Sequence, residues 1–201
     1  SKNIYKVILV GEANVGKSSI IYNYTTGKFR QNTLNTITNS FSNKTITIYN
    51  KELAFEIWDT AGQEKYRSFT RICYKNVDAV IFVYDVTSSN SFNQIKEYWY
   101  NDVMNNISKN PICALAANKC DLFDREEVNE EEGRNYAKEY NLIFNKTSAY
   151  SSVGIEELFI EIANKLLEIE NKESNTDNSI KLDKQNHRNE KNKSTKCCYS
   201  I

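Results

Sequence analysis

The sequence predicts a single α/β domain built on a mostly parallel sheet and followed by a polar tail. Short apolar runs rich in β-branched residues alternate along the chain with longer segments of helical periodicity, which is the pattern of a doubly wound fold. Composition limits the size, because 201 residues with 40% hydrophobic content suffice for one good core but leave two packed domains cramped.

Three apolar runs are predicted to be buried strands, and the second and third to be central in a parallel sheet, because near-continuous hydrophobicity is what burial on both faces requires. They cover residues 4–10, 79–84 and 112–117. Residues 41–49 and 53–58 instead alternate apolar with polar side chains, which predicts an antiparallel hairpin joined by a tight turn at Asn50-Lys51.

Helices are expected from about Lys17 and over residues 91–105, 130–140 and 155–169, so that they cover both faces of the sheet. The last helix carries one apolar stripe of the kind that faces a core. This stripe consists of Leu158, Ile162, Leu166 and Ile169.

The domain is expected to span residues 1–170, and residues 171–201 are expected to form a separate tail. These last residues are mainly Asn, Lys, Ser, Asp and Glu, with almost nothing apolar to bury. The entropy cost of ordering them therefore favours disorder.

Charge and cysteine content narrow the class of protein. Lys plus Arg and Asp plus Glu both total 26, which argues against a dedicated nucleic-acid binder. Five cysteines without a C-x-x-C pair make a disulfide framework unexpected and favour a reducing compartment. No signal peptide is recognisable, and no apolar run approaches the ~20 residues needed to cross a bilayer, so the protein is expected on the cytosolic side.

A glycine-rich loop follows the first predicted strand, and its sequence GEANVGKS over residues 11–18 matches G-x-x-x-x-G-K-[ST] directly before a helix. In such a loop the backbone N–H groups surround phosphate oxygens, and the helix adds its positive end. Lys17 is expected to reach the β- and γ-phosphates, and the Ser18 hydroxyl to ligate Mg²⁺. The residues predicted to bind phosphate are Ala13, Asn14, Val15, Gly16, Lys17, Ser18 and Ser19. The motif predicts a nucleoside triphosphate without deciding the base.

A second motif, N-K-C-D, follows the last central strand at its carboxyl end, where ligands bind in open α/β sheets. With Ser148-Ala149 it resembles the guanine-recognition elements of the Ras superfamily. A carboxylate can accept hydrogen bonds from both N1–H and the 2-amino group of guanine, and adenine offers no such pair of donors, so Asp121 is expected to select guanine. The resemblance further implies Asn118 beside the base, the Lys119 stem on its face, and the Ala149 N–H directed to O6.

Residues 58–64, with the sequence WDTAGQE, resemble the D-T-A-G-Q-E element of these GTPases. The resemblance implies that Asp59 supports Mg²⁺, that the Gly62 N–H meets the γ-phosphate, and that Gln63 orients the attacking water. It also implies that Thr36 closes on Mg²⁺ in the GTP state and that Phe29 lies against the guanine edge. The predicted catalytic residues are Gln63, Lys17, Thr36 and Gly62, and the predicted metal ligands are Ser18, Thr36 and Asp59.

Within the superfamily, the segments FEIWD, KYRSFT and VYDVT resemble the Rab family, and residues 116–122 and 157–162 are similar to its early-endosomal branch. Over about residues 4–170 this implies a P-loop GTPase domain with a six-stranded, mostly parallel sheet that has one antiparallel strand. It implies slow hydrolysis of GTP to GDP, cycling between the two states, and recruitment of effectors to membranes in vesicle traffic. An exchange factor, a GTPase-activating protein, an escort protein and a GDI are implied partners, while the effectors stay unidentified.

The C-terminal residues CCYSI resemble the double-cysteine prenylation ends of Rab proteins, and CYSI also fits C-a-a-X loosely. Two lipids anchor a protein stably where one is marginal, so both Cys197 and Cys198 are expected to carry lipid. The expected location is the cytosolic face of intracellular membranes, endosomal by the branch resemblance, with a soluble cytosolic pool.

Three alternatives stay open. A Ras-like signalling protein would better fit a single C-a-a-X cysteine. A binding-only pseudo-GTPase is opposed by four intact residues, Lys17, Ser18, Asp59 and Gln63. The loop after Thr36 nevertheless departs from the family pattern and keeps this alternative open. A P-loop kinase that uses ATP is disfavoured by Asp121.

Overall fold

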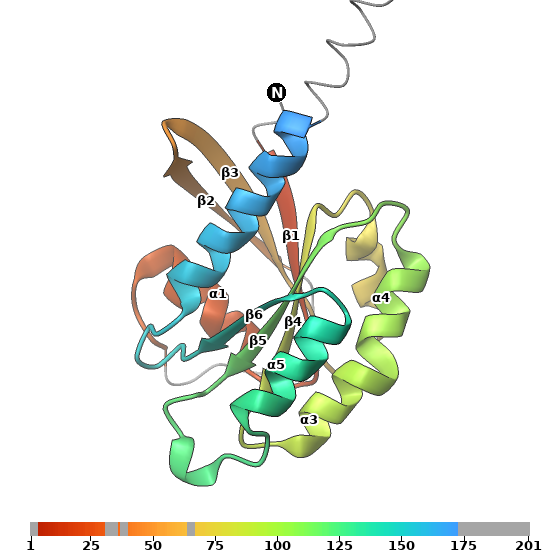
Figure 1. Cartoon of the computed structure of the whole chain (residues 1–201), viewed down its shortest axis with the longest axis vertical. Coiled ribbons are helices and arrows are strands. Elements are labelled where there is room, and N and C mark those ends of the chain that lie inside the picture. The colour runs from red at the N-terminus through yellow and green to blue at the C-terminus, as the bar shows by residue number, and fades with distance from the viewer. Residues whose placement is uncertain (1–3, 31–35, 37–39, 64–66, 173–201) are drawn as a thin grey trace, which may run out of the picture. The chain divides into compact units, whose positions relative to one another are not determined.

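The computed structural model describes residues 4–30, 36, 40–63 and 67–172. The chain divides into two compact units, Ser1–Asn164 and Lys165–Ile201, and the first holds a six-stranded sheet in the order β2-β3-β1-β4-β5-β6 (Figure 1). The strands are β1 at Ile4–Val10, β2 at Ser40–Ile48, β3 at Lys51–Asp59, β4 at Ala79–Asp85, β5 at Ile112–Asn118 and β6 at Ile143–Thr147. The β2–β3 pair is antiparallel and the other described pairs are parallel, which confirms the predicted sheet.

The strand order brings several loops to one edge of the sheet. Strands β1, β3, β4, β5 and β6 run in the same direction, so the segments that follow their carboxyl ends meet along that edge. The order also reverses at β1, since β3 lies on one side of it and β4 on the other. Ligands in open α/β sheets bind at this kind of reversal.

The described helices vary in length. They are α1 at Lys17–Thr26, α2 at Arg67–Thr70, η2 at Arg71–Tyr74, α3 at Ser89–Gln94, η3 at Ile95–Trp99, α4 at Tyr100–Asn106, η4 at Phe123–Arg125 and α5 at Glu130–Glu139, followed by a helix over residues 155–172. The segments α3, η3 and α4 follow one another without a break. The short helices α2 and η2 were not predicted, because four residues are too few to display helical periodicity.

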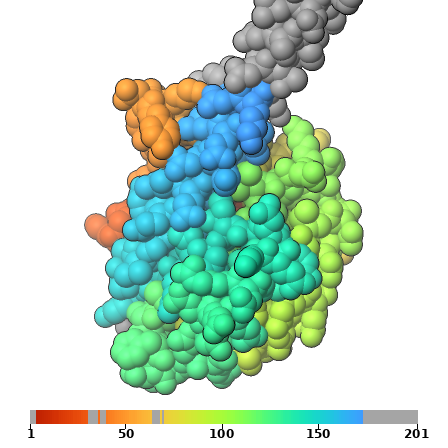
Figure 2. Space-filling model, viewed as in Figure 1, coloured from red at the N-terminus to blue at the C-terminus, as the bar shows by residue number. Residues whose placement is uncertain are grey.

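Helices pack on both faces of the sheet, as predicted. On one face Phe82 and Leu115 lie in an apolar cluster with Phe92, Trp99 and Tyr136 of the α3–α4 and α5 segments. On the other face Tyr24 of α1 stacks on Phe159 with 3.7 Å between ring centroids, and Phe159 contacts Phe55 of β3. Figure 2 shows the α3–α4 segment and α5, in yellow-green to blue-green, over much of one side, whereas the β2–β3 hairpin, in orange, is visible at the edge.

Two details differ from the sequence prediction. The hairpin turn lies at Tyr49-Asn50, one residue earlier than expected, because Lys51 pairs with Ile48 as the first residue of β3. Both turn residues have left-handed backbone angles, with φ of 49° and 61°. The apolar stripe of the last helix is correct at Leu158 and Ile162, which are buried, but wrong at Ile169, which is 41% exposed close to the end of that helix.

Candidate active site

A cavity opens at the carboxyl edge of the sheet. It is lined by Ala13, Asn14, Gly16, Lys17, Ser18, Ser19, Phe29, Arg30, Thr36, Thr60, Gly62, Gln63, Asn118, Lys119, Asp121, Leu122, Ala149 and Tyr150. Of the nucleotide-site residues predicted from sequence, Val15, Asp59 and Ser148 are not in its lining, and all three are buried. The cavity lining thus combines residues from three motifs that lie far apart in the chain: the glycine-rich loop 11–18, the segment 58–64 and the N-K-C-D motif at 118–121.

Four lining residues were not predicted: Arg30, Thr60, Leu122 and Tyr150. Each directly follows a predicted site residue in the sequence, which is the signal that could have found them. Tyr150 contacts Phe29 edge to face, with ring centroids 5.4 Å apart, so two aromatic side chains meet at the mouth of the cavity.

The phosphate-binding loop takes its shape from two glycines. Gly11 and Gly16 have backbone φ angles of 146° and 98°, which residues with a side chain rarely adopt. A Cβ on Gly11 would meet the Val83 carbonyl oxygen, and one on Gly16 would meet the Asn118 side chain. Gly16 is the N-cap of α1, and among the described residues no side chain caps this helix. Its first amides are therefore available to an anion.

Lys17 lies inside this loop and is 5% exposed. Its Nζ donates hydrogen bonds to the carbonyl oxygens of Gly11, at 2.8 Å, and Glu12, at 2.7 Å. Burial lowers the pKa of Lys17 to about 8, although the charges of Asp59 and Glu12 partly oppose this. The buried ammonium group of Lys17 is held only by uncharged carbonyl groups in these two hydrogen bonds. A phosphate ligand would place a negative charge beside it.

Three oxygen-bearing side chains from three segments meet beside Lys17. The Ser18 and Thr36 hydroxyl oxygens are 2.9 Å apart, and Thr36 Oγ1 donates to Asp59 Oδ2 at 3.4 Å. Asp59 Oδ1 is buried and has no hydrogen-bond partner among the described residues. Burial raises the pKa of Asp59, against the effects of Ser18, Lys17 and Thr36. A divalent cation would satisfy this carboxylate.

The donor set fits Mg²⁺ in particular. Mg²⁺ prefers oxygen ligands and is usually held by one or two carboxylates together with waters and substrate phosphates. The three side chains supply two hydroxyls and one carboxylate. Within the described part of the chain, no group of three or more His, Cys, Asp or Glu residues could hold a metal ion. A metal at Asp59 would therefore share its coordination with the bound phosphates, as Mg²⁺ does.

The segment after β3 packs closely on the phosphate-binding loop. Thr60 Oγ1 donates to the Leu9 carbonyl oxygen at 2.5 Å. A Cβ on Gly62 would lie 2.5 Å from the carbonyl carbon and oxygen of Glu12 and 2.6 Å from the Ala13 nitrogen. Only glycine fits at this position without a shift. Gln63 is half-buried and lines the cavity beside it.

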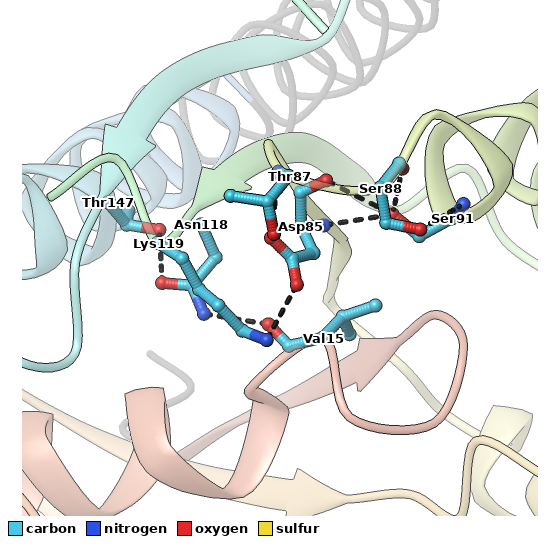
Figure 3. Close-up of polar contacts among 8 residues, drawn as sticks. All are labelled: Val15, Asp85, Thr87, Ser88, Ser91, Asn118, Lys119 and Thr147. Carbon is cyan, nitrogen blue, oxygen red and sulfur yellow. Dashed lines mark hydrogen bonds and ion pairs between the residues drawn. The ribbon is translucent and has the colours of Figure 1, made fainter. Parts of the chain in front are cut away.

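Asn118 joins the part of the cavity that Lys119 and Asp121 line to the loop after β1 (Figure 3). Its Nδ2 donates to the Val15 carbonyl oxygen at 2.7 Å, and its Oδ1 accepts from the Thr147 hydroxyl at 3.2 Å. The side chain is 1% exposed. The amide therefore links the ends of β5 and β6 to the loop after β1, in addition to lining the cavity.

Lys119 lies along the cavity, and its ammonium group pairs with Asp85 at the end of β4, with 2.6 Å between Nζ and Oδ2 (Figure 3). The other carboxylate oxygen of Asp85 accepts from the Thr87 N–H at 2.9 Å and from the Thr87 hydroxyl at 2.7 Å. Asp85 was not among the predicted site residues. Its role depends on the pairing of β4 with β5, which places Asp85 beside Asn118.

Asp121 is supported by the loop after β6. The Ser148 hydroxyl lies 2.5 Å from Asp121 Oδ1, and the Asn23 side chain donates to the Ala149 carbonyl oxygen at 3.1 Å. Ser148 is fully buried, whereas Asp121 lines the cavity and is half-buried. A fixed carboxylate that faces the cavity can accept two hydrogen bonds from one edge of a base.

Comparison with known proteins decides the family. The Ras family model matches residues 6–168. The chain belongs to the Ras family. It is 42% identical over 161 residues to the Ras-related protein RHN1 of Nicotiana plumbaginifolia, a match that covers 80% of each chain. It is similar to Rab5 of Nicotiana tabacum, at 39% over 161 residues and 80% of each chain. Human Rab-22A is 40% identical over 161 residues, which cover 80% of this chain and 82% of that protein.

The protein is therefore a Rab-family small GTPase, and the predicted family and fold are confirmed. It hydrolyses GTP to GDP, cycles between the two nucleotide states and acts in vesicle traffic, as members of this family do. The alternatives of an ATP-dependent kinase and of a binding-only protein are thereby set aside.

Proposed function

We propose that this Rab-family GTPase binds GTP together with Mg²⁺ held by Ser18, Thr36 and Asp59, and that it acts as a two-state switch on endosomal membranes. The observation that carries the nucleotide chemistry is the meeting of these three side chains beside Lys17. Asp59 adds a buried oxygen that lacks a hydrogen-bond partner among the described residues.

Hydrolysis follows from the positions of the surrounding groups. Lys17 and the amides at the start of α1 bind the phosphates, and Asp121 holds the guanine edge. The Gly62 N–H binds the γ-phosphate, and Gln63 orients the water that attacks it. Mg²⁺, when bound, offsets negative charge on the phosphate oxygens. Catalysis of this kind depends on positioning and electrostatics, so its unassisted rate is low.

The switch rests on Thr36 and Gly62. Both belong to segments outside the strands, and both are proposed to bind the γ-phosphate or the metal beside it. Loss of the γ-phosphate removes the shared ligand and frees the two segments to rearrange. Exchange factor, activating protein, escort protein and GDI are proposed to act on these states.

Membrane attachment is proposed to come from the prenylated tail. The tail of residues 171–201 and its Cys197 and Cys198 lie almost wholly outside the described residues, which end at 172. Across residues 4–30, 36, 40–63 and 67–172, no helix is long and apolar enough to cross a bilayer. The similarity to Rab5 and Rab-22A supports the endosomal assignment.

Mg²⁺ dependence tests the nucleotide site. In the purified full-length protein, removal of Mg²⁺ with EDTA is expected to speed GDP dissociation by roughly tenfold or more, because the metal shields phosphate charge. Thr36→Ala is expected to weaken binding of a non-hydrolysable GTP analogue more than binding of GDP. Thr45→Ala, an exposed threonine on β2, is the matched control. GDP dissociation that does not respond to EDTA would contradict the metal assignment.

Fractionation of cells tests the tail. The double variant Cys197→Ser with Cys198→Ser is expected to leave the membrane fraction entirely, and each single variant to bind only weakly, since one lipid is a marginal anchor. GDP binding should be unchanged in all three. A double variant that stays on membranes would require another anchor.

A further inference from the structure

The continuous helix formed by α3, η3 and α4 contains a π-turn. The Tyr100 N–H donates to the Ile95 carbonyl oxygen, five residues earlier. Such turns are rare in proteins and occur frequently at functional sites. Trp99 is the last residue of this π-turn and is fully buried. Its indole Nε1 donates to Glu12 Oε1 at 3.0 Å, across 87 positions of sequence.

Glu12 lies at a junction of the phosphate-binding site. Its carbonyl oxygen accepts the hydrogen bond from Lys17 Nζ at 2.7 Å. The same backbone lies against Gly62, so closely that a Cβ there would come within 2.5 Å of it. A displacement of Glu12 would therefore disturb two groups at once, Lys17 and Gly62, both of which are proposed to contact the γ-phosphate.

The same helix also contacts η2. Asp102 in α4 is 7% exposed. It accepts hydrogen bonds from Arg71 Nε at 2.9 Å and from the Tyr74 hydroxyl at 3.0 Å, both in η2. Just before η2, Thr70 Oγ1 donates to the Ala61 carbonyl oxygen at 3.1 Å. The helix thus contacts the phosphate-binding loop through Trp99 and the segment after β3 through Asp102.

We propose that Trp99 is a positioning residue for GTP hydrolysis. Its indole N–H holds the Glu12 side chain, and Glu12 in turn sets the separation between Lys17 and Gly62 at the γ-phosphate. The inference rests on the roles proposed above for Lys17 and Gly62. It goes beyond them by assigning part of the catalytic geometry to a side chain outside the cavity, since Trp99 does not line it.

The expected effect is selective. A hydrogen bond to a charged group is substantial, and small displacements of catalytic groups reduce rates strongly. Loss of the Trp99 N–H is therefore expected to slow hydrolysis roughly tenfold. GDP is proposed to be held largely by the base site and the loop amides, and Trp99 does not line the cavity, so GDP affinity should change by less than about threefold.

The test compares two tryptophan variants in the full-length protein. Trp99→Phe removes the indole N–H but keeps an aromatic ring in the core. Trp58→Phe is the matched control, because Trp58 Nε1 also donates to a glutamate, Glu56 Oε1, at 2.6 Å. Single-turnover GTP hydrolysis and GDP affinity are measured for both. We expect slow hydrolysis in Trp99→Phe alone, with GDP affinity close to that of the wild type.

Substitutions of Glu12, the acceptor in this hydrogen bond, provide an independent test. Glu12→Ala removes the acceptor and should slow hydrolysis about as much as Trp99→Phe, whereas Glu12→Gln keeps an acceptor oxygen and should be several-fold faster than Glu12→Ala. In the double variant with Trp99→Phe and Glu12→Ala, the losses should not multiply, since both remove the same interaction. If Trp99→Phe does not fold, the Glu12 pair alone decides.

Either of two results would overturn the inference. One is hydrolysis at the wild-type rate in Trp99→Phe or in Glu12→Ala, and the other is a fully multiplicative loss in the double variant. Lys17→Ala in the same assay keeps this failure distinct from failure of the proposed function. If Lys17→Ala hydrolyses GTP normally, the proposed phosphate site is wrong. If Lys17→Ala is inactive while Trp99→Phe is normal, only the positioning role of Trp99 fails.

Discussion

At the end of the cavity proposed to bind the base, the polar side chains form hydrogen bonds or ion pairs with neighbouring protein groups, whereas beside Lys17 the Asp59 carboxylate is held more loosely. Asn118 hydrogen-bonds to Val15 in the loop after β1 and to Thr147 at the end of β6, Lys119 pairs with Asp85, and Asp121 lies 2.5 Å from the Ser148 hydroxyl. Thr36 instead reaches Asp59 over 3.4 Å, and one Asp59 oxygen has no hydrogen-bond partner among the described residues.

This difference matches the two tasks of a switch. The base is the same in GDP and GTP, so a site that is already assembled can retain either nucleotide without paying an ordering cost on each cycle. The γ-phosphate is what distinguishes the two states, so the groups that detect it must depend on it. We therefore expect the base to be recognised by side chains that are already assembled, and the γ-phosphate by side chains whose arrangement depends on it.

The largest expected change in nucleotide affinity comes from a substitution at the base end of the cavity. Asp121→Asn should weaken GDP and GTP binding by roughly 10³-fold, because an amide offers a donor where guanine also presents one. Xanthine nucleotides, which carry a 2-oxo group, should bind better than in the wild type. Competition binding measures both. Asp124→Asn, an exposed aspartate in η4, is the control, and an unchanged preference for guanine in Asp121→Asn would refute the base assignment.

At the phosphate end of the cavity, Gln63→Leu should lower the rate of GTP hydrolysis roughly 10–100-fold without loss of nucleotide affinity. The reason is that the amide is proposed to contact water only in the transition state. Single-turnover hydrolysis and equilibrium binding separate the two quantities. Affinity that falls by orders of magnitude would place Gln63 among the binding contacts instead.

A smaller effect is expected for Ser18→Asn, which should shift preference toward GDP by roughly tenfold, since the metal contact matters most when the γ-phosphate shares the ion. The ratio of GDP to GTP-analogue affinity checks this. An unchanged ratio relative to wild type would argue that Ser18 is not a metal ligand.

The smallest effect is expected from a substitution outside the cavity. Asn129 caps α5, since its side chain accepts from the Glu132 N–H at 2.9 Å. Asn129→Ala should cost about 1 kcal/mol in the free energy of unfolding, measured by denaturant titration of the GDP-bound protein. GDP dissociation should not change. If it does, global stability and nucleotide retention are coupled, and the larger effects above need correction for that coupling.

The sequence predicted most of the sheet and most of the cavity, because these depend on local signals. A glycine-rich loop between strand and helix, or N-K-C-D after an apolar run, can be recognised within a few residues. The roles assigned to these residues stay predictions until they are tested. Local periodicity also located the hairpin, but not its turn, since the turn depends on which residues pair across two strands.

Contacts between distant segments were not predictable in the same way. Asp85 pairs with Lys119 because β4 and β5 are neighbours, and Trp99, the last residue of the π-turn, reaches Glu12 across 87 positions of sequence. Trp99 lies outside the motifs recognised in the sequence, and Asp85, although it belongs to the segment VYDVT, shows no sign there of its pairing with Lys119. Pattern-based reading finds residues that act through local chemistry and misses those that act through packing and register.

The turn between β2 and β3 offers a practical handle for engineering. Tyr49 adopts a left-handed φ of 49° and is 85% exposed, and a bulky residue in that conformation costs roughly 1–2 kcal/mol. Two-residue hairpins with such angles favour Asn-Gly. Replacing Tyr49 with Asn and Asn50 with Gly should therefore raise the melting temperature, and the thermostable variant would provide a sturdier background in which damaging substitutions elsewhere can still be purified.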